Sequence, residues 1–367
     1  QVSCSSQALC IMGAVFGCKH RTGAGSSFGA ERTQSSPGPT ELRGMQVLTK
    51  LPTGSWSDVL LFDWSKHEDD LMRQWPLKFR APNKALVANK AYPPSTSFAQ
   101  SPIRVTRWDA RQVRLPACPD GQPLVVDVVT SFFDYSAASG MSAWYPNFAH
   151  EVLFTAWNSD LLAQDELQVL EFPALCAVAH ALPAAHRRTV DCRQPTPILI
   201  QQVLRRCSID TVTAPSIYGN AFCRASSELA DARTRKLEPP VPANIYAIEA
   251  PPCGQGVYRR EQIMFILQAA FCAFGATRQV DDKPVELHIG YWGCGAYGGN
   301  HRLMILLQLI AAHLAGAARV VVHAVPQAQP AHDALRLFHE QLPLDSVQAA
   351  VDWAVAQRFQ WGVSDGN

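Results

Sequence analysis

The chain contains the sequence GYWGCGAYGGN at residues 290–300, in which five of eleven positions are glycine. An apolar, strand-like run at Val285–Ile289 precedes this loop, and Arg302–Ala317, with apolar residues at helical spacing, follows it. A strand, a glycine loop and a helix in this order present backbone N–H groups and a helix N-terminus to a phosphate group. Glycine suits such a loop because a Cβ atom would block close approach, and because positive φ angles are expected there. The stretch predicts an α/β fold with a phosphate-binding turn.

Two other interpretations of this loop stay open. Gly293, Gly295 and Gly298 satisfy the G-x-G-x-x-G pattern of dinucleotide-binding domains. Such a domain needs an acidic residue about twenty positions further on, whereas the first acid after this loop is Asp333. The other alternative is a tight turn that binds nothing. The two adjacent glycines and the flanking aromatic residues argue against a turn without a ligand.

Apolar runs of strand and helix type alternate along the rest of the chain, which is typical of an α/β domain with a mixed, mostly parallel sheet flanked by helices. Ligands of such sheets lie beyond the carboxyl ends of the strands, where the glycine loop is predicted to lie. We expect strands at 123–129, 150–155, 244–249, 285–289 and 318–325, and helices at 165–170, 197–206, 260–274 and 302–317.

Composition excludes several classes of protein. The 367 residues are 47% hydrophobic and 17% charged, with a net charge of +1, so no overall field favours direct binding of nucleic acid or of a membrane surface. The eleven cysteines form no C-x-x-C pair and no zinc-binding spacing. We expect mostly buried, reduced thiols of an intracellular protein, no metal site, no cofactor and no membrane-spanning helix. The sequence does not distinguish nucleus, cytoplasm or organelle.

Three regions are predicted along the chain. Residues 1–44, rich in Ser, Gly, Cys and Gln, are expected to be a disordered or targeting tail. Residues 45–119 are expected to form a helical accessory layer, and residues 120–367 the main α/β domain. The helical pattern rests on apolar residues spaced by three and four, namely Trp56, Val59, Leu60, Trp64, Leu71, Met72, Trp75 and Leu77. A basic patch follows at Arg104, Arg107, Arg111 and Arg114, for which a solvated face is favoured over a phosphate-binding role.

A second candidate site is the run Gln164-Asp165-Glu166, in which two adjacent carboxylates lie in apolar surroundings. One interpretation is an exposed helix start, where acids interact favourably with the helix dipole. The other is a carboxyl group whose pKa is raised by burial and by its charged neighbour, so that it donates a proton near pH 7. The residues alone leave both open.

Together these segments resemble the poly(ADP-ribose) glycohydrolases, whose catalytic domain has the macrodomain fold. WGCGAYGG at 292–299 is similar to that family's W-G-C-G-x-F/Y-G-G loop. QDE at 164–166, followed by FPAL at 172–175, resembles its Q-E-E signature and trailing P-E-L. Phe148-Ala149 begins sixteen residues before Gln164, the spacing expected between the family's F-A-N and Q-E-E. YAIEA at 246–250 resembles its A-I-D-A strand, and the resemblance covers roughly residues 120–345.

The resemblance implies a glycosidase that acts on ADP-ribose polymers or adducts. Glu166 would be the catalytic acid that protonates the 2′-oxygen of a ribose–ribose bond, and Asp165 would help to orient the substrate. Tyr297 would pack against the bound ADP-ribose, and Tyr218 would stack near the adenine. The remaining substrate-binding residues that the resemblance implies are Gln164, His150, Trp157, Gly293, Cys294, Gly295, Ala296, Gly298 and Gly299.

This chain departs from the family pattern at three places. Thr155-Ala156-Trp157 stands where the family has three glycines that let the backbone approach the substrate, and His150 replaces the asparagine of F-A-N. Asp165 replaces the first glutamate and is one methylene shorter. Three functions therefore remain open: a divergent poly(ADP-ribose) glycohydrolase, a catalytically inactive module that binds ADP-ribose, or a structural subunit that binds protein partners in a larger assembly.

Overall fold

The structure is a computed structural model of the chain, and it describes residues 46–48, 57–62, 79–92, 103–112, 115–116, 124–343 and 345–366. The tail predicted at residues 1–44 lies outside the described residues. The boundaries predicted at 44 and 119 stay predictions.

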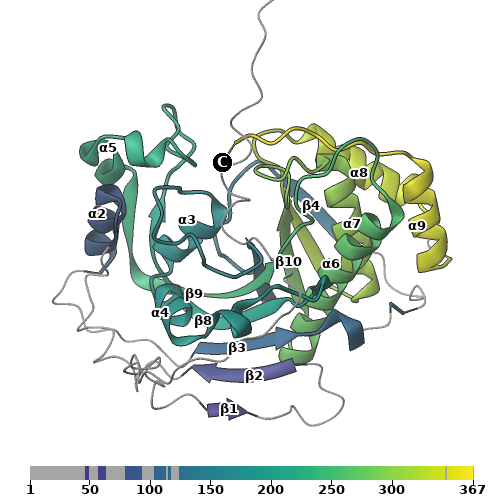
Figure 1. Cartoon of the computed structure of the whole chain (residues 1–367), viewed down its shortest axis with the longest axis horizontal. Coiled ribbons are helices and arrows are strands. Elements are labelled where there is room, and N and C mark those ends of the chain that lie inside the picture. The colour runs from purple at the N-terminus through teal and green to yellow at the C-terminus, as the bar shows by residue number, and fades with distance from the viewer. Residues whose placement is uncertain are drawn as a thin grey trace, which may run out of the picture. The chain divides into compact units, whose positions relative to one another are not determined.

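A mixed sheet runs through the described part of the chain (Figure 1) and has nine strands in the order β1-β2-β3-β8-β9-β5-β10-β11-β4. The strands from β9 to β4 pair in parallel, and those from β1 to β9 pair antiparallel. Their bounds are β1 Gln46–Leu48, β2 Ser57–Phe62, β3 Ile103–Trp108, β4 Val125–Val129, β5 Ser142–Phe148, β8 Ile198–Ile209, β9 Thr234–Ile248, β10 Val285–Gly290 and β11 Arg319–His323. The fold class, α/β with helices on both sides of a mixed sheet, is confirmed.

Helices cover the two faces of this sheet and enclose two separate cores. Successive residues of β9 point to opposite faces: Ile245 and Ala247 lie in one core, and Tyr246 and Ile248 in the other. That alternation is the period of two of a strand buried on both sides. Helices α2 Pro82–Ala91, α3 Gln164–Glu171, α4 Ala174–Ala181 and α5 Ser227–Ala232 pack on one face, and α6 Arg260–Val280, α7 His301–Leu314, α8 Gln329–Glu340 and α9 Val347–Ala356 on the other (Figure 1).

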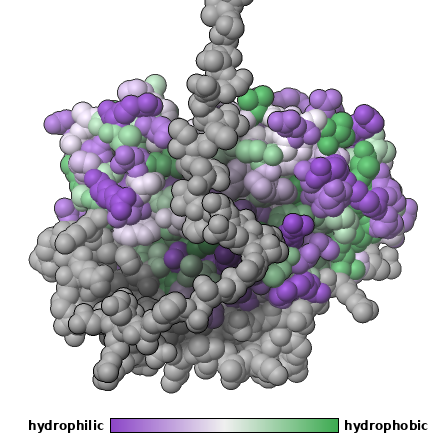
Figure 2. All heavy atoms as spheres, in the orientation of Figure 1, coloured by the Kyte–Doolittle hydropathy of each residue, from purple (hydrophilic) through white to green (hydrophobic). Residues whose placement is uncertain are grey.

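The strands predicted at 123–129, 244–249, 285–289 and 318–325 are present as β4, the end of β9, β10 and β11. The helices predicted at 165–170, 260–274 and 302–317 are present as α3, α6 and α7. Helix α6 has the length and apolar composition of a membrane span, but most of it is buried in the fold. Over α8 and α9 the visible surface is mainly hydrophilic (Figure 2).

The helix predicted at 197–206 is wrong, because this segment belongs to strand β8. A β-bulge at Gln202, with φ of 62°, shifts the register between Ile200 and Val203. The extra residue breaks the alternation of apolar and polar residues. The apolar residues on either side of the bulge are then three apart, which imitates the spacing of a helix.

The strand predicted at 150–155 is also wrong. These residues form turns, with one isolated bridge between Val152 and Arg188. Leu153 and Phe154 are fully buried, and Phe154 has φ of 59°. The apolar run therefore fills the core beneath a turn and does not pair with a neighbouring strand.

The helical layer predicted at 45–119 is wrong over its first part. Val59 and Leu60 lie in β2, which pairs antiparallel with β1 and β3. The other residues of that pattern lie outside the described residues. Helix α2 is the one α-helix among the residues of 45–119 that the structure describes. This region thus extends the sheet through β1–β3 and adds one helix beside α3.

Candidate functional site

The candidate site lies where three neighbouring parallel strands end. Strand β5 ends at Phe148 and is followed by His150, while β9 ends at Ile248 and is followed by Glu249. Strand β10 ends at Gly290, where the glycine loop begins. Helix α3, which carries the predicted carboxylates, packs against β5 and β8. The topology therefore brings both predicted segments to one edge of the sheet, as is usual for ligand sites of α/β folds.

The glycine loop requires glycine at several positions. Gly293 and Gly298 have φ of 68° and 64°, which confirms the expected positive φ angles. A Cβ atom on Gly293 would lie 2.4 Å from the Cβ of Ala250, and one on Gly299 would lie 2.8 Å from the carbonyl oxygen of Gly293. The loop is thus folded tightly on itself and on the residue after Glu249.

Backbone N–H groups of the loop remain available to a ligand. The N–H of Gly298 donates to the carbonyl of Gly295 (3.0 Å), and that of Gly299 to Gly293 (2.8 Å). Among the described residues, none accepts a hydrogen bond from the N–H of Gly295, Ala296 or Tyr297. Consecutive free N–H groups in a turn form a concave site for an anion. The loop therefore has the chemistry of a diphosphate cradle.

Two side chains of the loop, those of Cys294 and Tyr297, differ in exposure. Cys294 is buried and its thiol contacts the carbonyl of Trp292 at 3.6 Å, so it is a packing residue. Tyr297 is half-buried, and burial raises the pKa of its hydroxyl, with smaller contributions from Glu249, Cys253 and Asp165 among others. Tyr297 is therefore close to the carboxylates of the site.

Both carboxylates of α3 are buried, with 7% of Asp165 and 4% of Glu166 exposed. Burial raises the pKa of Asp165, and the charge of Glu166 raises it further. Burial also raises the pKa of Glu166, against a hydrogen bond that its Oε2 accepts from the N–H of Ala163 at 3.1 Å. This geometry favours the interpretation as a proton donor over that of an exposed helix start.

Amide side chains fix these carboxylates to the end of β5. Asn147 Nδ2 donates to Oδ1 of Asp165 and to Oε1 of Gln168, each at 2.9 Å. Gln164 donates to the carbonyl of Pro146 (2.9 Å) and accepts from the N–H of Phe148 (2.8 Å). Gln164 therefore anchors the start of α3 to the strand, and its amide is already engaged.

Lys84 is a site residue that the sequence analysis missed. Its side chain, on α2, is fully buried, and Nζ donates to the carbonyl oxygen of Trp157 at 3.0 Å. Burial lowers the pKa of Lys84 to about 8, while the charges of Glu166 and Asp165, with those of Cys176 and Asp160, oppose this change. A buried cation thus lies beside the two carboxylates. Nothing in the local sequence of a lysine within a helix signals this position.

Tyr218 and Gln164 line a cavity of about 690 Å³. The ring of Phe132, also in its wall, lies 6.5 Å from that of Tyr218. Burial raises the pKa of the Tyr218 hydroxyl, and Glu166 adds to the increase. Gly219 pairs with Leu162, just before α3, through two hydrogen bonds of 3.0 and 3.3 Å. The predicted adenine side of the site is therefore joined to the acid-bearing helix.

Trp157 and His150 occupy different surroundings. The Trp157 ring packs edge-on against Phe79 at 5.2 Å and does not belong to the wall of the cavity beside Tyr218. His150 is exposed, and the N–H of Val152 donates weakly to its Nδ1 at 3.5 Å. The structure thus places His150 at the end of β5, but it gives Trp157 a packing role.

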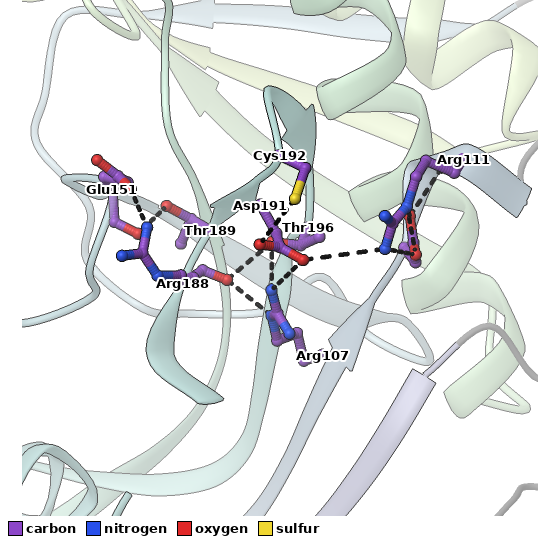
Figure 3. Close-up of polar contacts among 9 residues, drawn as sticks. Arg107, Arg111, Glu151, Arg188, Thr189, Asp191, Cys192 and Thr196 are labelled. Carbon is purple, nitrogen blue, oxygen red and sulfur yellow. Dashed lines mark hydrogen bonds and ion pairs between the residues drawn. The ribbon is translucent and has the colours of Figure 1, made fainter. Parts of the chain in front are cut away.

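Two arginines of the basic patch predicted at 104–114, Arg107 and Arg111, are engaged in hydrogen bonds and ion pairs (Figure 3). Arg107 donates to the carbonyl of Arg188 at 2.8 Å and to Thr196 at 3.2 Å, and Arg111 pairs with Asp109. Arg188 in turn pairs with Glu151, which follows His150. Arg114 lies outside the described residues. These contacts brace the short hairpin of β6 Val190–Asp191 and β7 Gln194–Pro195, and they agree with the preference against a phosphate-binding role.

Glu249 also belongs to this edge and was not among the predicted site residues. Its side chain is 8% exposed and lines a second cavity, of about 760 Å³, together with Glu151 and Arg193. Burial raises the pKa of Glu249 to about 8, with a further contribution from Glu151. The A-I-D-A resemblance was the signal that could have found it. Among the described residues, no group of three His, Cys, Asp or Glu side chains could hold a metal ion.

A comparison with protein families defines the class of this domain. Residues 201–330 match the family described as "Poly (ADP-ribose) glycohydrolase (PARG), Macro domain fold". The resemblance to that family is thereby confirmed over these residues, which match its macro-fold domain. The match includes Tyr218 and the glycine loop, but it does not include α3 with Asp165 and Glu166.

Solved structures with a similar fold include bacterial poly(ADP-ribose) glycohydrolases. The enzyme from Thermomonospora curvata is 20% identical, over 70% of this chain and 85% of that chain, with a TM-score of 0.44. The same enzyme bound to the inhibitor ADP-HPD is 19% identical, over 70% and 85%, with a TM-score of 0.42. The enzyme from Deinococcus radiodurans in complex with ADP-ribose is 18% identical, over 59% and 83%, with a TM-score of 0.36. No curated protein matches the chain at a significant level.

Proposed function

We propose that this protein binds ADP-ribose along the glycine loop and hydrolyses ribose–ribose O-glycosidic bonds of ADP-ribose polymers or adducts. One observation carries the proposal. The buried carboxylates Asp165 and Glu166 follow Gln164, which is bonded to the end of β5, and the neighbouring strand β10 ends at the loop whose Gly295, Ala296 and Tyr297 N–H groups have no acceptor among the described residues. A proton donor and an anion cradle at one edge are what cleavage of a sugar bond next to a diphosphate requires.

Different parts of the site bind different parts of the substrate. The N–H groups of the loop donate to the diphosphate, and the ring of Tyr297 packs against the sugar. The adenine enters the cavity of about 690 Å³, where Phe132 and Tyr218 offer aromatic faces. Aromatic side chains stack on bases at a gain of about 1–3 kcal/mol per base. The scissile bond then lies toward α3.

Glu166 performs the proton transfers. Its carboxyl group, whose pKa burial raises, gives its proton to the 2′-oxygen as the C1–O bond breaks. The bonding electrons leave with that oxygen, and an oxocarbenium-like ribosyl cation remains. Water then attacks C1, and the Glu166 carboxylate takes the proton from it. Asp165, held by Asn147, and the cation of Lys84 set the charge around this carboxyl group.

A second function, ADP-ribose binding without turnover, is favoured by one observation. Thr155-Ala156-Trp157 stands where the related enzymes have three glycines, and its backbone is tied down by the hydrogen bond from Lys84 to Trp157. Glycine lets a backbone approach a ligand closely, whereas these side chains do not. Loss of that approach would misplace the distal ribose relative to Glu166. A role as a structural subunit needs neither ADP-ribose binding nor turnover.

The test combines calorimetric titration with ADP-ribose and release of ADP-ribose from an automodified polymer. Binding with release, abolished in Glu166→Gln but with binding retained, is the expected result. Glu340→Gln, an exposed residue of α8, serves as the matched control and should keep both properties. Release that survives Glu166→Gln assigns the acid to another residue. Binding without release makes the protein a binding module, and no binding at millimolar ligand removes the ADP-ribose function altogether.

A further inference from the structure

The yellow segment after α9 runs back above α8 toward the C-terminus (Figure 1), and its backbone bonds to the glycine loop. We call residues 359–366 the strap. Its first part is firmly attached: the N–H of Tyr258 donates to the carbonyl of Phe359 at 2.9 Å, and Phe359 is buried. The ring of Trp361 stacks on Tyr258 with centroids 4.1 Å apart. The backbone N–H of Trp361 donates to the carbonyl of Gly256 at 2.9 Å. This part belongs to the core beside α6.

The second part of the strap, from Gly362 onward, lies directly on the loop. The N–H of Gly362 donates to the carbonyl of Gly298 at 2.8 Å, and that of Asp365 to the carbonyl of Gly295 at 3.3 Å. An added Cβ on Gly298 would lie 2.9 Å from the backbone nitrogen of Ser364. One on Gly295 would lie 2.9 Å from Oδ2 of Asp365. The strap therefore occupies the space that side chains at Gly295 and Gly298 would need.

The strap also reaches the opposite wall of the site. Asn220 Nδ2 donates to the carbonyl of Gly366 at 3.2 Å, and Asn220 is two residues after Tyr218. The charge of Asp365 contributes to the raised pKa of Tyr218, behind burial and Glu166. Asp365 thus lies between the loop and Tyr218, the two parts of the chain that the proposed ligand has to bridge.

We propose that the strap is an internal competitor of the ligand: the Asp365 carboxylate stands at the anion cradle, and residues 362–366 must move aside before a diphosphate can bind. This inference rests on the proposed function, because it takes the loop as the diphosphate site. A carboxylate and a diphosphate are both anions, so the two repel each other and cannot share the free N–H groups of Gly295, Ala296 and Tyr297.

The second part is held weakly enough to be displaced. Residues 362–366 are all exposed, and Val363 is 90% exposed, so opening uncovers little apolar surface. Among the described residues, the backbone N–H groups of Gly362 and Asp365 join it to the loop, and the Asn220 amide joins it to the far wall. Phe359 and Trp361 stay in place when it opens, since their contacts lie with Tyr258. The strap can therefore open at Gly362 without loss of the fold.

The test compares ADP-ribose and inorganic pyrophosphate binding, by calorimetry, to the full chain and to a chain without residues 362–367. The shortened chain keeps Phe359 and Trp361. If the strap closes the site nine-tenths of the time, its removal tightens binding about tenfold. Asp365→Asn, which keeps the backbone contacts but removes the charge, should tighten binding by a smaller factor. Glu340→Gln, which removes an exposed acid far along α8, should leave the affinity unchanged.

Each outcome decides the proposal. Equal or weaker ADP-ribose binding by a folded shortened chain overturns it, because the strap is then a wall of the site. If the shortened chain does not fold, Asp365→Asn decides, with unchanged affinity as the contrary result. If ADP-ribose binds neither form, the proposed function fails, and pyrophosphate tests the strap alone. Pyrophosphate that binds only the shortened chain supports the strap, whereas binding to both equally or to neither overturns it.

Discussion

The Lys84 ammonium donates a hydrogen bond to the carbonyl oxygen of Trp157 over 3.0 Å. The lysine comes from α2, and the tryptophan from the turn that precedes α3. This bond holds the turn in the place where related enzymes have glycines, and it puts a buried cation near Glu166 and Asp165. The positive charge of Lys84 on α2 therefore lowers the pKa of the two carboxyl groups on α3.

Lys84→Met should raise the pKa of Glu166. The substitution keeps an apolar chain of similar length but removes the cation that lowers the pKa of both carboxyl groups. We expect the titration midpoint of Glu166, followed by carboxyl ¹³C NMR, to move to higher pH. Lys90→Met on the same helix is the control, because Lys90 pairs with Asp231 and not with α3. An unchanged midpoint in Lys84→Met would refute the assigned role.

The glycine loop was predictable because its chemistry resides in the backbone. Strand β10, the loop and α7 follow one another directly, and glycine spacing records where a Cβ atom cannot fit. The carboxylates of α3 were also predictable as a candidate, since two adjacent acids in apolar surroundings are unusual. Sequence could not decide whether they are buried, because burial depends on α2 packing against α3.

Neither the role of Lys84 nor the strap could be predicted from the sequence, and the physical reason is the same for both. Lys84 and Lys90 occupy one helix and look equivalent in sequence, yet one is fully buried and the other keeps a third of its side chain exposed. The strap meets the loop through residues some sixty positions away, such as Gly362 on Gly298. Local propensity carries no information about such contacts, and without homologous sequences no covariation reveals them.

Glu249→Gln should make stability less dependent on pH. Burial raises the pKa of Glu249 from 4.5 to about 8, so the folded state holds a proton that the unfolded state releases. The stability that this proton provides is complete below pH 4.5 and is lost as the pH rises through 8. The free energy of unfolding of the variant, measured by urea denaturation, should exceed that of the wild type by on the order of 5 kcal/mol at pH 9 and match it below pH 4.5. Glu340→Gln, with an exposed side chain, should follow the wild type throughout, and a constant gap for Glu249→Gln would contradict the assignment.

Arg205→Met should destabilise the wall of the cavity beside Tyr218. Arg205 donates to both oxygens of Glu171, at 2.9 and 2.8 Å, and both residues are buried. Removing one partner leaves a buried charge uncompensated, which costs about 3–5 kcal/mol. Urea denaturation measures this cost.

The double variant Arg205→Met with Glu171→Gln separates charge from packing. Its neutral amide can still accept the hydrogen bond from the N–H of Ile209, which Glu171 accepts at 2.8 Å. We expect it to be more stable than Arg205→Met alone. Arg336→Met, which breaks the exposed pair with Asp333, should change stability by less than about 1 kcal/mol. If Arg205→Met lost as little stability as Arg336→Met, the buried pair would contribute nothing beyond its packing.

Gly293→Ala should cost more than the strain of its backbone alone. Gly293 and Gly316 have nearly equal φ, 68° and 67°, but a Cβ on Gly316 meets nothing within 4 Å, whereas one on Gly293 lies 2.4 Å from the Cβ of Ala250. Gly316→Ala therefore measures the left-handed strain by itself, about 1–2 kcal/mol. Gly293→Ala adds overpacking of about 1–3 kcal/mol, because the atom that its Cβ would meet is the Cβ of Ala250, which cannot rotate away. The difference between the two variants, measured by urea denaturation, isolates the contact that joins the glycine loop to the end of β9. Equal losses would show that the loop shifts freely, and a loop that shifts freely cannot hold its N–H groups in one arrangement for a diphosphate.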